Sequence, residues 1–300
     1  MSEAPLNETQ DLQFATPAAA IAREAGALLR DYYRRGVETE YKGDVDLVTE
    51  ADRASEKLIV ERLHSVFPEH GVYGEEGTRS NIDREYRWYI DPLDGTTNFA
   101  HGFPVFCVSM GLERRAPSLG PAQDGEIVAG IIYDPLRDEL FTAEKGKGAY
   151  LNGSPIHVSR IADLAEALLA TGFPSRKRHD NPNIHFYQEF TLRSHGVRRP
   201  GAAALDLAYT ACGRIDAYWE FNLNPWDTSA GALLVTEAGG SMTSFDGSPF
   251  RLDSREVLAT NGLLRDELLG LFAEMFAGHA LEPIPTPAEF AARRAQRKMF

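Results

Sequence analysis

The stretch WYIDPLDGTTNF at residues 88–99 constrains the fold of this chain more than any other segment. Residues 87–90 are typical of a buried strand, which we expect to end at Pro92, because proline cannot donate to a strand ladder. Asp91 and Asp94 lie three residues apart, before a Gly-Thr-Thr segment that suits a tight turn into a helix. Carboxylates at this spacing, beside the N–H groups of a helix start, indicate magnesium-assisted phosphate chemistry. The alternative is an ordinary turn, since Asp, Pro and Gly are the usual turn residues.

Further acidic residues stand at the ends of expected strands and helices. Glu75 lies in a Gly-Glu-Glu-Gly segment that follows a short strand-like stretch, and Asp227 precedes a helix expected from Thr228. Asp52 lies three residues after Thr49, which is a capping-box spacing. Each position also has a purely structural alternative: an exposed acidic loop for Glu75, a helix N-cap for Asp227 and a capping box for Asp52.

Hydrophobic periodicity predicts helices and strands along most of the chain. A first helix is expected to open at Thr16-Pro17, with Thr16 as its N-cap, and to end at Gly36. A loop at residues 116–125 joins two strands, and Asn152-Gly153 predicts a hairpin turn. We expect further helices at residues 50–66, 182–194, 202–212, 228–238 and 263–276, and strands at 106–112, 127–133, 139–143, 215–221 and 256–260.

The composition of the chain argues against several classes of protein. The chain has 31 Lys and Arg against 44 Asp and Glu, a net charge of −13, which argues against a nucleic-acid binder. Apolar runs are only a few residues long, so we expect no membrane span, and residues 1–10 lack the features of a signal peptide. Cys107 and Cys212 lie far apart in apolar surroundings and are expected to be reduced, which favours a cytoplasmic protein.

Together these segments resemble the inositol monophosphatase family, and in particular its bacterial inositol-1-monophosphatase branch. DPLDGTTNF at residues 91–99 matches the first signature of the family, and WDTSAG at 226–231 with EAGG at 237–240 resembles the second. Two signatures in the right order are highly specific, and the similarity extends from about residue 17 to about residue 278.

The resemblance implies an α/β fold, a layered αβαβα sandwich of the inositol monophosphatase and fructose-1,6-bisphosphatase type. Residues 1–155 are then an α+β metal- and phosphate-binding domain, and residues 156–280 an α/β substrate domain. Residues 281–300 form a C-terminal tail, which is rich in proline and then in basic residues.

The resemblance also implies a Mg²⁺ cofactor, with two to three ions in each site. The first ion takes the side chains of Glu75 and Asp91 and the carbonyl of Leu93, and the second takes Asp91, Asp94 and Asp227. A third, weaker ion binds on the Glu75 side. All of these side chains are present, so the resemblance predicts an active enzyme.

In the family, water rather than a protein nucleophile attacks phosphorus. The corresponding catalytic residues here are Thr96 and Glu75, which orient and deprotonate the water, and Asp52, which holds the Thr96 hydroxyl. The N–H groups of Gly95 and Thr96 hold the phosphate, and Asp94 contributes to substrate binding as well as to the metal site.

The substrate alcohol is expected to meet the loop Gly201-Ala202-Ala203 and the carboxylates of Glu220 and Asp227. Ala202 departs from the Ser or Thr that is common in the family, so a hydroxyl contact is lost there.

Lys42 and Asp46 resemble the mobile lysine-containing loop of the family, with a spacing one residue shorter. The alternative for Lys42 is an ordinary surface lysine.

The implied activity is Mg²⁺-dependent hydrolysis of inositol 1-phosphate to myo-inositol and phosphate, by a lithium-sensitive homodimer whose partner is a small-molecule phosphate monoester. Alternative substrates are histidinol phosphate, a broad range of sugar phosphates or nucleotide 3′-phosphates. A further alternative is a regulatory interaction protein with an incidental phosphatase site.

Overall fold

The structure is a computed structural model that describes residues 13–36, 39–41, 47–115, 125–173, 181–279 and 284–291. Lys42 and Asp46 lie outside the described residues, as does most of the expected loop at residues 116–125. For residues 39–41 and 47–49 only the backbone is described, so the capping role expected of the Thr49 side chain stays a prediction.

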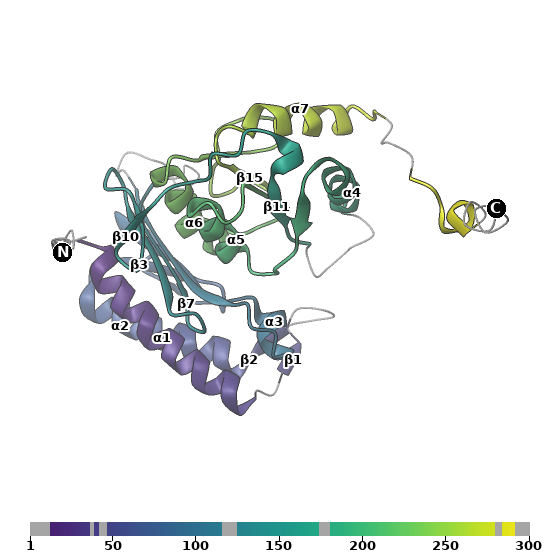
Figure 1. The fold of residues 1–300 in the computed structure, drawn as a ribbon. Helices are drawn as coiled ribbons and strands as arrows, with labels where there is room; N and C mark the ends of the chain where they lie inside the picture. The colour runs from purple at the N-terminus through teal and green to yellow at the C-terminus, as the bar shows by residue number, and fades with distance from the viewer. Residues whose placement is uncertain are drawn as a thin grey trace, which may run out of the picture.

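The described helices and strands form five layers, seen edge-on in Figure 1. Helices α1 and α2 cover one face of an eight-stranded sheet, and α5 and α6 lie between that sheet and a five-stranded one. Helices α4 and α7 pack on the outer face of the second sheet. The expected αβαβα sandwich is therefore confirmed. The helices are α1 (Ala15–Arg35), α2 (Glu50–Val66), α3 (Thr96–Ala100), α4 (Asn183–Arg193), α5 (Ala203–Ala211), α6 (Pro225–Glu237) and α7 (Arg265–Phe276).

The first sheet has the strand order β10-β9-β8-β7-β6-β5-β3-β4, and all of its neighbouring strands are antiparallel except β3 and β5. Its strands are β3 (Gly71–Gly74), β4 (Arg79–Ser80), β5 (Tyr86–Asp94), β6 (Cys107–Arg114), β7 (Glu126–Asp134), β8 (Glu139–Glu144), β9 (Ala149–Leu151) and β10 (Ser154–Ile156). The predicted turn at Asn152-Gly153 joins β9 to β10, and both of its residues have positive φ.

The second sheet has the order β12-β11-β13-β15-β14, in which β12, β11 and β13 are parallel. Its strands are β11 (Leu168–Thr171), β12 (Gly196–Arg198), β13 (Ala217–Phe221), β14 (Ser241–Thr243) and β15 (Glu256–Thr260), and a separate pair is formed by β1 (Thr39–Tyr41) and β2 (Leu47–Thr49). Hydrophobic periodicity does not predict β1, β2, β4, β11, β12 or β14, because two to four residues carry too little pattern. The division into domains near residue 155 stays a prediction.

The N-terminus of α1 differs from its predicted cap. The helix begins at Ala15, before the expected Thr16. The backbone N–H groups of Phe14 and Ala15 donate to Oε1 of Glu144, at 2.6 and 2.8 Å. A carboxylate from β8 therefore satisfies the first N–H groups of the helix, a partner that no local pattern reveals.

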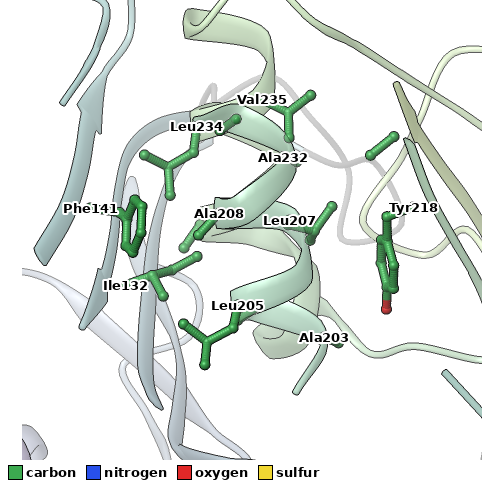
Figure 2. Close-up of a cluster of buried hydrophobic side chains, with 14 of the residues drawn as sticks. Ile132, Phe141, Ala203, Leu205, Leu207, Ala208, Tyr218, Ala232, Leu234 and Val235 are labelled. Atoms are coloured by element: carbon green, nitrogen blue, oxygen red, sulfur yellow. The ribbon is translucent and has the colours of Figure 1, made fainter. Parts of the chain in front are cut away.

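The cluster between the two sheets is built around α5 and α6 (Figure 2). Leu205 and Leu234 of these helices lie beside Ile132 and Phe141 of the first sheet. At Gly231 an added Cβ would lie 2.5 Å from side-chain carbons of Leu207, so glycine permits the two helices to approach closely. This packing holds the N-termini of α5 and α6 near the end of β5, which carries Asp91 and Asp94.

Candidate active site

The end of β5 carries the first two expected metal ligands, Asp91 and Asp94, which are buried at 3% and 8% exposure. Pro92 does not end the strand, contrary to prediction. The pairing with β6 shifts register between Asp91 and Asp94 and then resumes, so Pro92 lies in an irregularity where no ladder hydrogen bond is required. Asp91 Oδ1 accepts a hydrogen bond from the Leu93 N–H at 3.0 Å.

Asp94 connects the first sheet to α5. Its carboxylate accepts hydrogen bonds from the N–H groups of Ala203 at 3.2 Å and Ala204 at 2.7 Å, and from the thiol of Cys107 at 3.6 Å. The α5 N-terminus thus supplies donors to an acidic side chain that lies more than a hundred residues earlier in the chain.

The Gly-Thr-Thr segment forms the predicted turn into a helix. Gly95 has a φ of 94°, and α3 begins at Thr96. An added Cβ at Gly95 would lie 2.8 Å from the carbonyl oxygen of Val105, so glycine is required there both by conformation and by space. The Thr96 hydroxyl lies 3.0 Å from Oδ1 of Asp52 and 3.1 Å from the Leu93 carbonyl oxygen. Asp52 is 1% exposed, so the hydroxyl has a fixed, buried acceptor.

Glu75 begins the loop that joins β3 to β4. Its N–H donates to the Ile90 carbonyl of β5 at 3.1 Å. The buried carboxylate of Glu56, from α2, accepts hydrogen bonds from the N–H groups of Glu76 and Thr78 and from the Thr78 hydroxyl. The loop that carries Glu75 is therefore held by a second carboxylate behind it.

Asp227 lies in the first turn of α6, which begins at Pro225 and not at the expected Thr228. Asn224 is the N-cap, and Oδ2 of Asp227 accepts from its N–H at 2.7 Å in a capping box. The structural alternative for Asp227 is thus partly correct, because the residue has a capping role. A second oxygen of the same carboxylate is still available to a ligand.

Two of these carboxylates, those of Asp91 and Asp94, are buried, and the charges of neighbouring carboxylates act on Asp91 and Asp227, so the group converges. Burial raises the pKa of Asp91 well above its usual range, and the charges of Glu75, Asp94 and Asp227 raise it further. Burial raises the pKa of Asp94 to about 6, against the lowering effect of the α5 N–H groups. The pKa of Asp227 is raised by desolvation and then by the charge of Glu75. A divalent cation would remove this repulsion.

The donor set fits Mg²⁺ by its chemistry, since the metal prefers carboxylate and carbonyl oxygens. Glu75, Asp91, Asp94 and Asp227 supply the carboxylates, and Leu93 supplies the carbonyl expected for the first ion. Over the residues that the structure describes, no group of three or more His, Cys, Asp or Glu side chains is already arranged as a metal-binding cluster. The assignment of these residues to Mg²⁺ therefore rests on two observations: the charges of neighbouring carboxylates raise the pKa values of Asp91 and Asp227, and carboxylate oxygens are the ligands that Mg²⁺ prefers.

Glu220, at the far end of β13, is the expected acceptor for the substrate alcohol. It is 8% exposed, and the Tyr218 hydroxyl donates to its Oε2 at 2.5 Å. An added Cβ at Gly172, the residue after β11, would lie 2.0 Å from the same oxygen, so there is room for the carboxylate only because residue 172 is glycine. Burial raises the pKa of Glu220 to about 7.

Asn98 was not singled out as a site residue, yet it joins the two halves of the site. Its Nδ2 lies within hydrogen-bond distance of the carbonyls of Val105, Pro200 and Gly201, at 2.8, 2.9 and 3.2 Å. Asn98 thereby holds the expected substrate loop, which includes Gly201, against α3. The sequence feature that indicates a role for Asn98 is its position inside the first signature, at residues 91–99.

Asp206 was also missed. It is 1% exposed on α5, and neither of its carboxylate oxygens has a hydrogen-bond partner among the described residues. Burial raises its pKa well above the usual range, and the charges of Glu220 and Asp94 add to the effect. An Asp in an otherwise apolar helix was a visible signal in the sequence.

The structure thus brings together Glu75, Asp91, Asp94 and Asp227, with Thr96 on Asp52, and it places the loop at residues 201–203 beside them. Glu220 lies close enough for Asp94 to affect its pKa.

Comparison with known proteins now decides the family. The sequence model of the inositol monophosphatase family matches residues 11–277. The chain belongs to this family. The Inositol-1-monophosphatase of Synechocystis sp. is 41% identical over 303 residues and covers 99% of both chains. The Nus factor SuhB of Pseudomonas aeruginosa is 44% identical, over 81% of this chain and 90% of that protein.

The fold comparison agrees. The solved structure of inositol monophosphatase from Anabaena has a TM-score of 0.76 and 40% identity, and the match covers 90% of this chain and 97% of that one. This member of the inositol monophosphatase family is a phosphatase. Within the described residues, no helix combines the length and the apolar character needed to cross a membrane.

Proposed function

We propose that this phosphatase is a Mg²⁺-dependent phosphomonoesterase that hydrolyses inositol 1-phosphate to myo-inositol and phosphate. The observation that carries the proposal is the convergence of Asp91, Asp94, Asp227 and Glu75: the charges of Glu75 and Asp94 raise the pKa values of both Asp91 and Asp227. Glu75, Asp91 and the Leu93 carbonyl would hold one ion, and Asp91, Asp94 and Asp227 a second. Bound Mg²⁺ would neutralise phosphate oxygens and lower the pKa of the attacking water.

The residues of the chain orient and deprotonate that water. The Thr96 hydroxyl has two acceptors in reach, Oδ1 of Asp52 and the Leu93 carbonyl, and it donates its single proton on that side, so the lone pairs of its oxygen can accept a hydrogen bond from the water. Glu75 receives the proton as the water oxygen bonds to phosphorus and the bond between phosphorus and the ester oxygen breaks, and the leaving oxygen takes up a proton from solvent to give the alcohol. The N–H groups of Gly95 and Thr96 hold the phosphate oxygens.

Substrate specificity is the finer part of the proposal. The Glu220 carboxylate accepts hydrogen bonds from hydroxyl groups of the leaving alcohol, which suits a polyol. Ala202 has no side-chain hydroxyl, so the loop at residues 201–203 contributes backbone groups only. The Synechocystis relative is named an inositol-1-monophosphatase, and this also supports the choice.

The first experiment measures phosphate release, with and without Mg²⁺, from inositol 1-phosphate, histidinol phosphate, fructose 1,6-bisphosphate and 3′-phosphoadenosine 5′-phosphate. We expect Mg²⁺-dependent release with a preference for inositol 1-phosphate. Preference for another compound would keep the chemistry and change the substrate. Release that is independent of metal would refute the proposed mechanism.

A matched pair of variants tests the site itself. Asp94→Asn should abolish phosphate release while the protein stays folded by circular dichroism. Asp253→Asn is the control, because its exposed side chain pairs only with nearby groups on the surface. Full activity of Asp94→Asn would contradict the assignment.

The proposal includes a homodimer in the cytoplasm, where the free thiols of Cys107 and Cys212 would stay reduced. Gel filtration with light scattering tests the dimer. Oxidation of Cys212 during purification without reductant, but not in fresh lysate, would support the reducing compartment.

A regulatory role is a second candidate, because a relative at 44% identity is named as a Nus factor. Its test is a pull-down with the intact chain and with a chain that lacks residues 283–300. Loss of specific partners on deletion would support recognition by the basic tail, and an unchanged set of partners would contradict it.

A further inference from the structure

Arg79, Tyr73 and Trp226 form a group of three stacked side chains beside the carboxylates, here called the Arg79 stack. Strands β3 and β4 pair so that Tyr73 lies directly opposite Arg79. The guanidinium carbon of Arg79 lies 3.4 Å from the centre of the Tyr73 ring. A cross-strand pair of this kind stabilises the hairpin, and the loop of that hairpin carries Glu75.

The Arg79 stack joins two parts of the molecule that are far apart in the sequence. The Tyr73 ring lies against the Trp226 ring, with centroids 5.8 Å apart and an angle of 27° between the planes. Arg79 also lies 5.8 Å from the Trp226 ring. Tyr73 belongs to β3 in the first sheet, whereas Trp226 belongs to the first turn of α6.

Both ends of the stack are anchored. Arg79 donates hydrogen bonds to the carbonyls of Gly74 and of Thr78, the latter at 2.7 Å, and these residues flank the loop of Glu75. On the other side, the Trp226 carbonyl accepts a hydrogen bond from the Ser109 hydroxyl of β6 at 3.2 Å. Ser109 in turn pairs with Asp91 in the sheet.

The stack is placed to control the separation of two carboxylates. Glu75 follows Tyr73 by two residues, and Asp227 follows Trp226 directly. The two negative charges repel each other. Without a contact that holds them together, the Glu75 loop and the start of α6 would tend to separate.

We propose that Arg79 is a positioning residue for metal binding, which holds the Glu75 loop against the start of α6 so that Glu75 and Asp227 face the same ions. The inference rests on the proposed Mg²⁺ dependence. It assigns to Arg79 no contact with substrate or metal. The pairing of Arg79 with Tyr73 fixes the conformation of the Glu75 loop. The contact of both side chains with Trp226 holds that loop against the start of α6.

The test is calorimetric titration of the full-length chain with MgCl₂, which measures binding without turnover. Arg79→Gln should weaken Mg²⁺ binding about two- to fivefold, the size of an exposed cation–π contact. At saturating Mg²⁺ its kcat should equal that of the unmodified chain, because no catalytic group has been removed. Arg79→Lys should give an intermediate affinity, since an ammonium keeps the charge but not the planar stacking.

Arg84→Gln is the matched control. Arg84 is also an exposed arginine, in the segment between β4 and β5, and it pairs with Glu69 at 3.3 Å on the surface. Its variant should bind Mg²⁺ as the unmodified chain does. In a Tyr73→Leu background, Arg79→Gln should cause a smaller loss than in the unmodified chain, because the contact with the Tyr73 ring is already gone and only the bonds to Gly74 and Thr78 and the contact with Trp226 remain to be lost.

The outcomes separate this inference from the proposed function. If the unmodified chain binds Mg²⁺ and turns over substrate while Arg79→Gln binds it equally well, only the positioning role is overturned. An equal loss of affinity in Arg84→Gln would also overturn it, because the effect would then be one of general charge. If the unmodified chain binds no Mg²⁺, the proposed function fails, and the positioning role fails with it.

Discussion

Glu220→Gln should stabilise the metal-free protein at neutral pH. Burial is the largest influence on Glu220 and raises its pKa from 4.5 to about 7, although the Tyr218 hydroxyl bond opposes the shift. The folded protein therefore binds a proton here that the unfolded chain releases. A pKa difference of this size corresponds to at most about 3 kcal/mol of lost stability at alkaline pH.

The sign of the pH dependence follows from this difference. As the pH falls below about 7, the folded protein takes up the proton and the penalty begins to decrease. The contribution of this carboxyl to the free energy of unfolding therefore rises as the pH falls. The gain is complete near pH 4.5, where the unfolded chain is protonated as well. A neutral amide at position 220 carries no such penalty, so we expect a gain of about 1–3 kcal/mol at pH 8 and about a quarter of that gain at pH 5.

Urea unfolding in EDTA at pH 5, 6, 7 and 8 measures this difference directly. Asp91, Asp94 and Asp206 remain in both proteins, so the difference between the two stability curves contains the proton of Glu220 and the effect of its charge on Asp94 and Asp206. Glu69→Gln is the control, because it makes the same chemical change at a side chain that is 77% exposed. Parallel curves for the Glu220→Gln and unmodified proteins across all four pH values would refute the reasoning.

Three further predictions follow from individual contacts. Asn98→Ala removes the bonds to Pro200 and Gly201, so KM should rise severalfold and the protein should lose about 1–2 kcal/mol in urea unfolding; unchanged KM would contradict the link. Gly74→Ala places a Cβ 2.3 Å from Glu56 Oε2, so the loop must shift and calorimetry should show weaker Mg²⁺ binding, whereas Gly146→Ala in an open turn should not. LiCl at about 10–50 mM should inhibit phosphate release, because the proposed second site is lined by carboxylates, and full turnover would contradict this.

The sequence alone was sufficient for features that depend on neighbouring residues. The strand before Asp91, the turn at Gly95 and the short helix α3 follow from residue types over about a dozen positions, and the structure confirms each of them. Most other helix and strand boundaries were also predicted within two residues, because hydrophobic periodicity is a local property. The resemblance to the family then supplied roles that spacing by itself left open.

Local patterns were misleading where a distant partner competes with a neighbour. The first helix was expected to be capped by Thr16, but Glu144 reaches its N–H groups from another strand. Pro92 was expected to end its strand, but β6 continues to pair beyond it. In both cases a contact between remote segments satisfies the backbone better than the local choice does.

The tertiary structure alone decided how the acidic residues meet. Glu75, Asp91 and Asp227 lie on three separate elements, and only the packing of α6 on the first sheet makes their charges interact. The anchoring of Asp94 by α5 and the contact of Arg79 and Tyr73 with Trp226 arise in the same way. The sequence determines which groups can bind a cation, because that is a property of side chains. Their distances depend on the folded chain, because burial and repulsion exist only between groups that folding brings together.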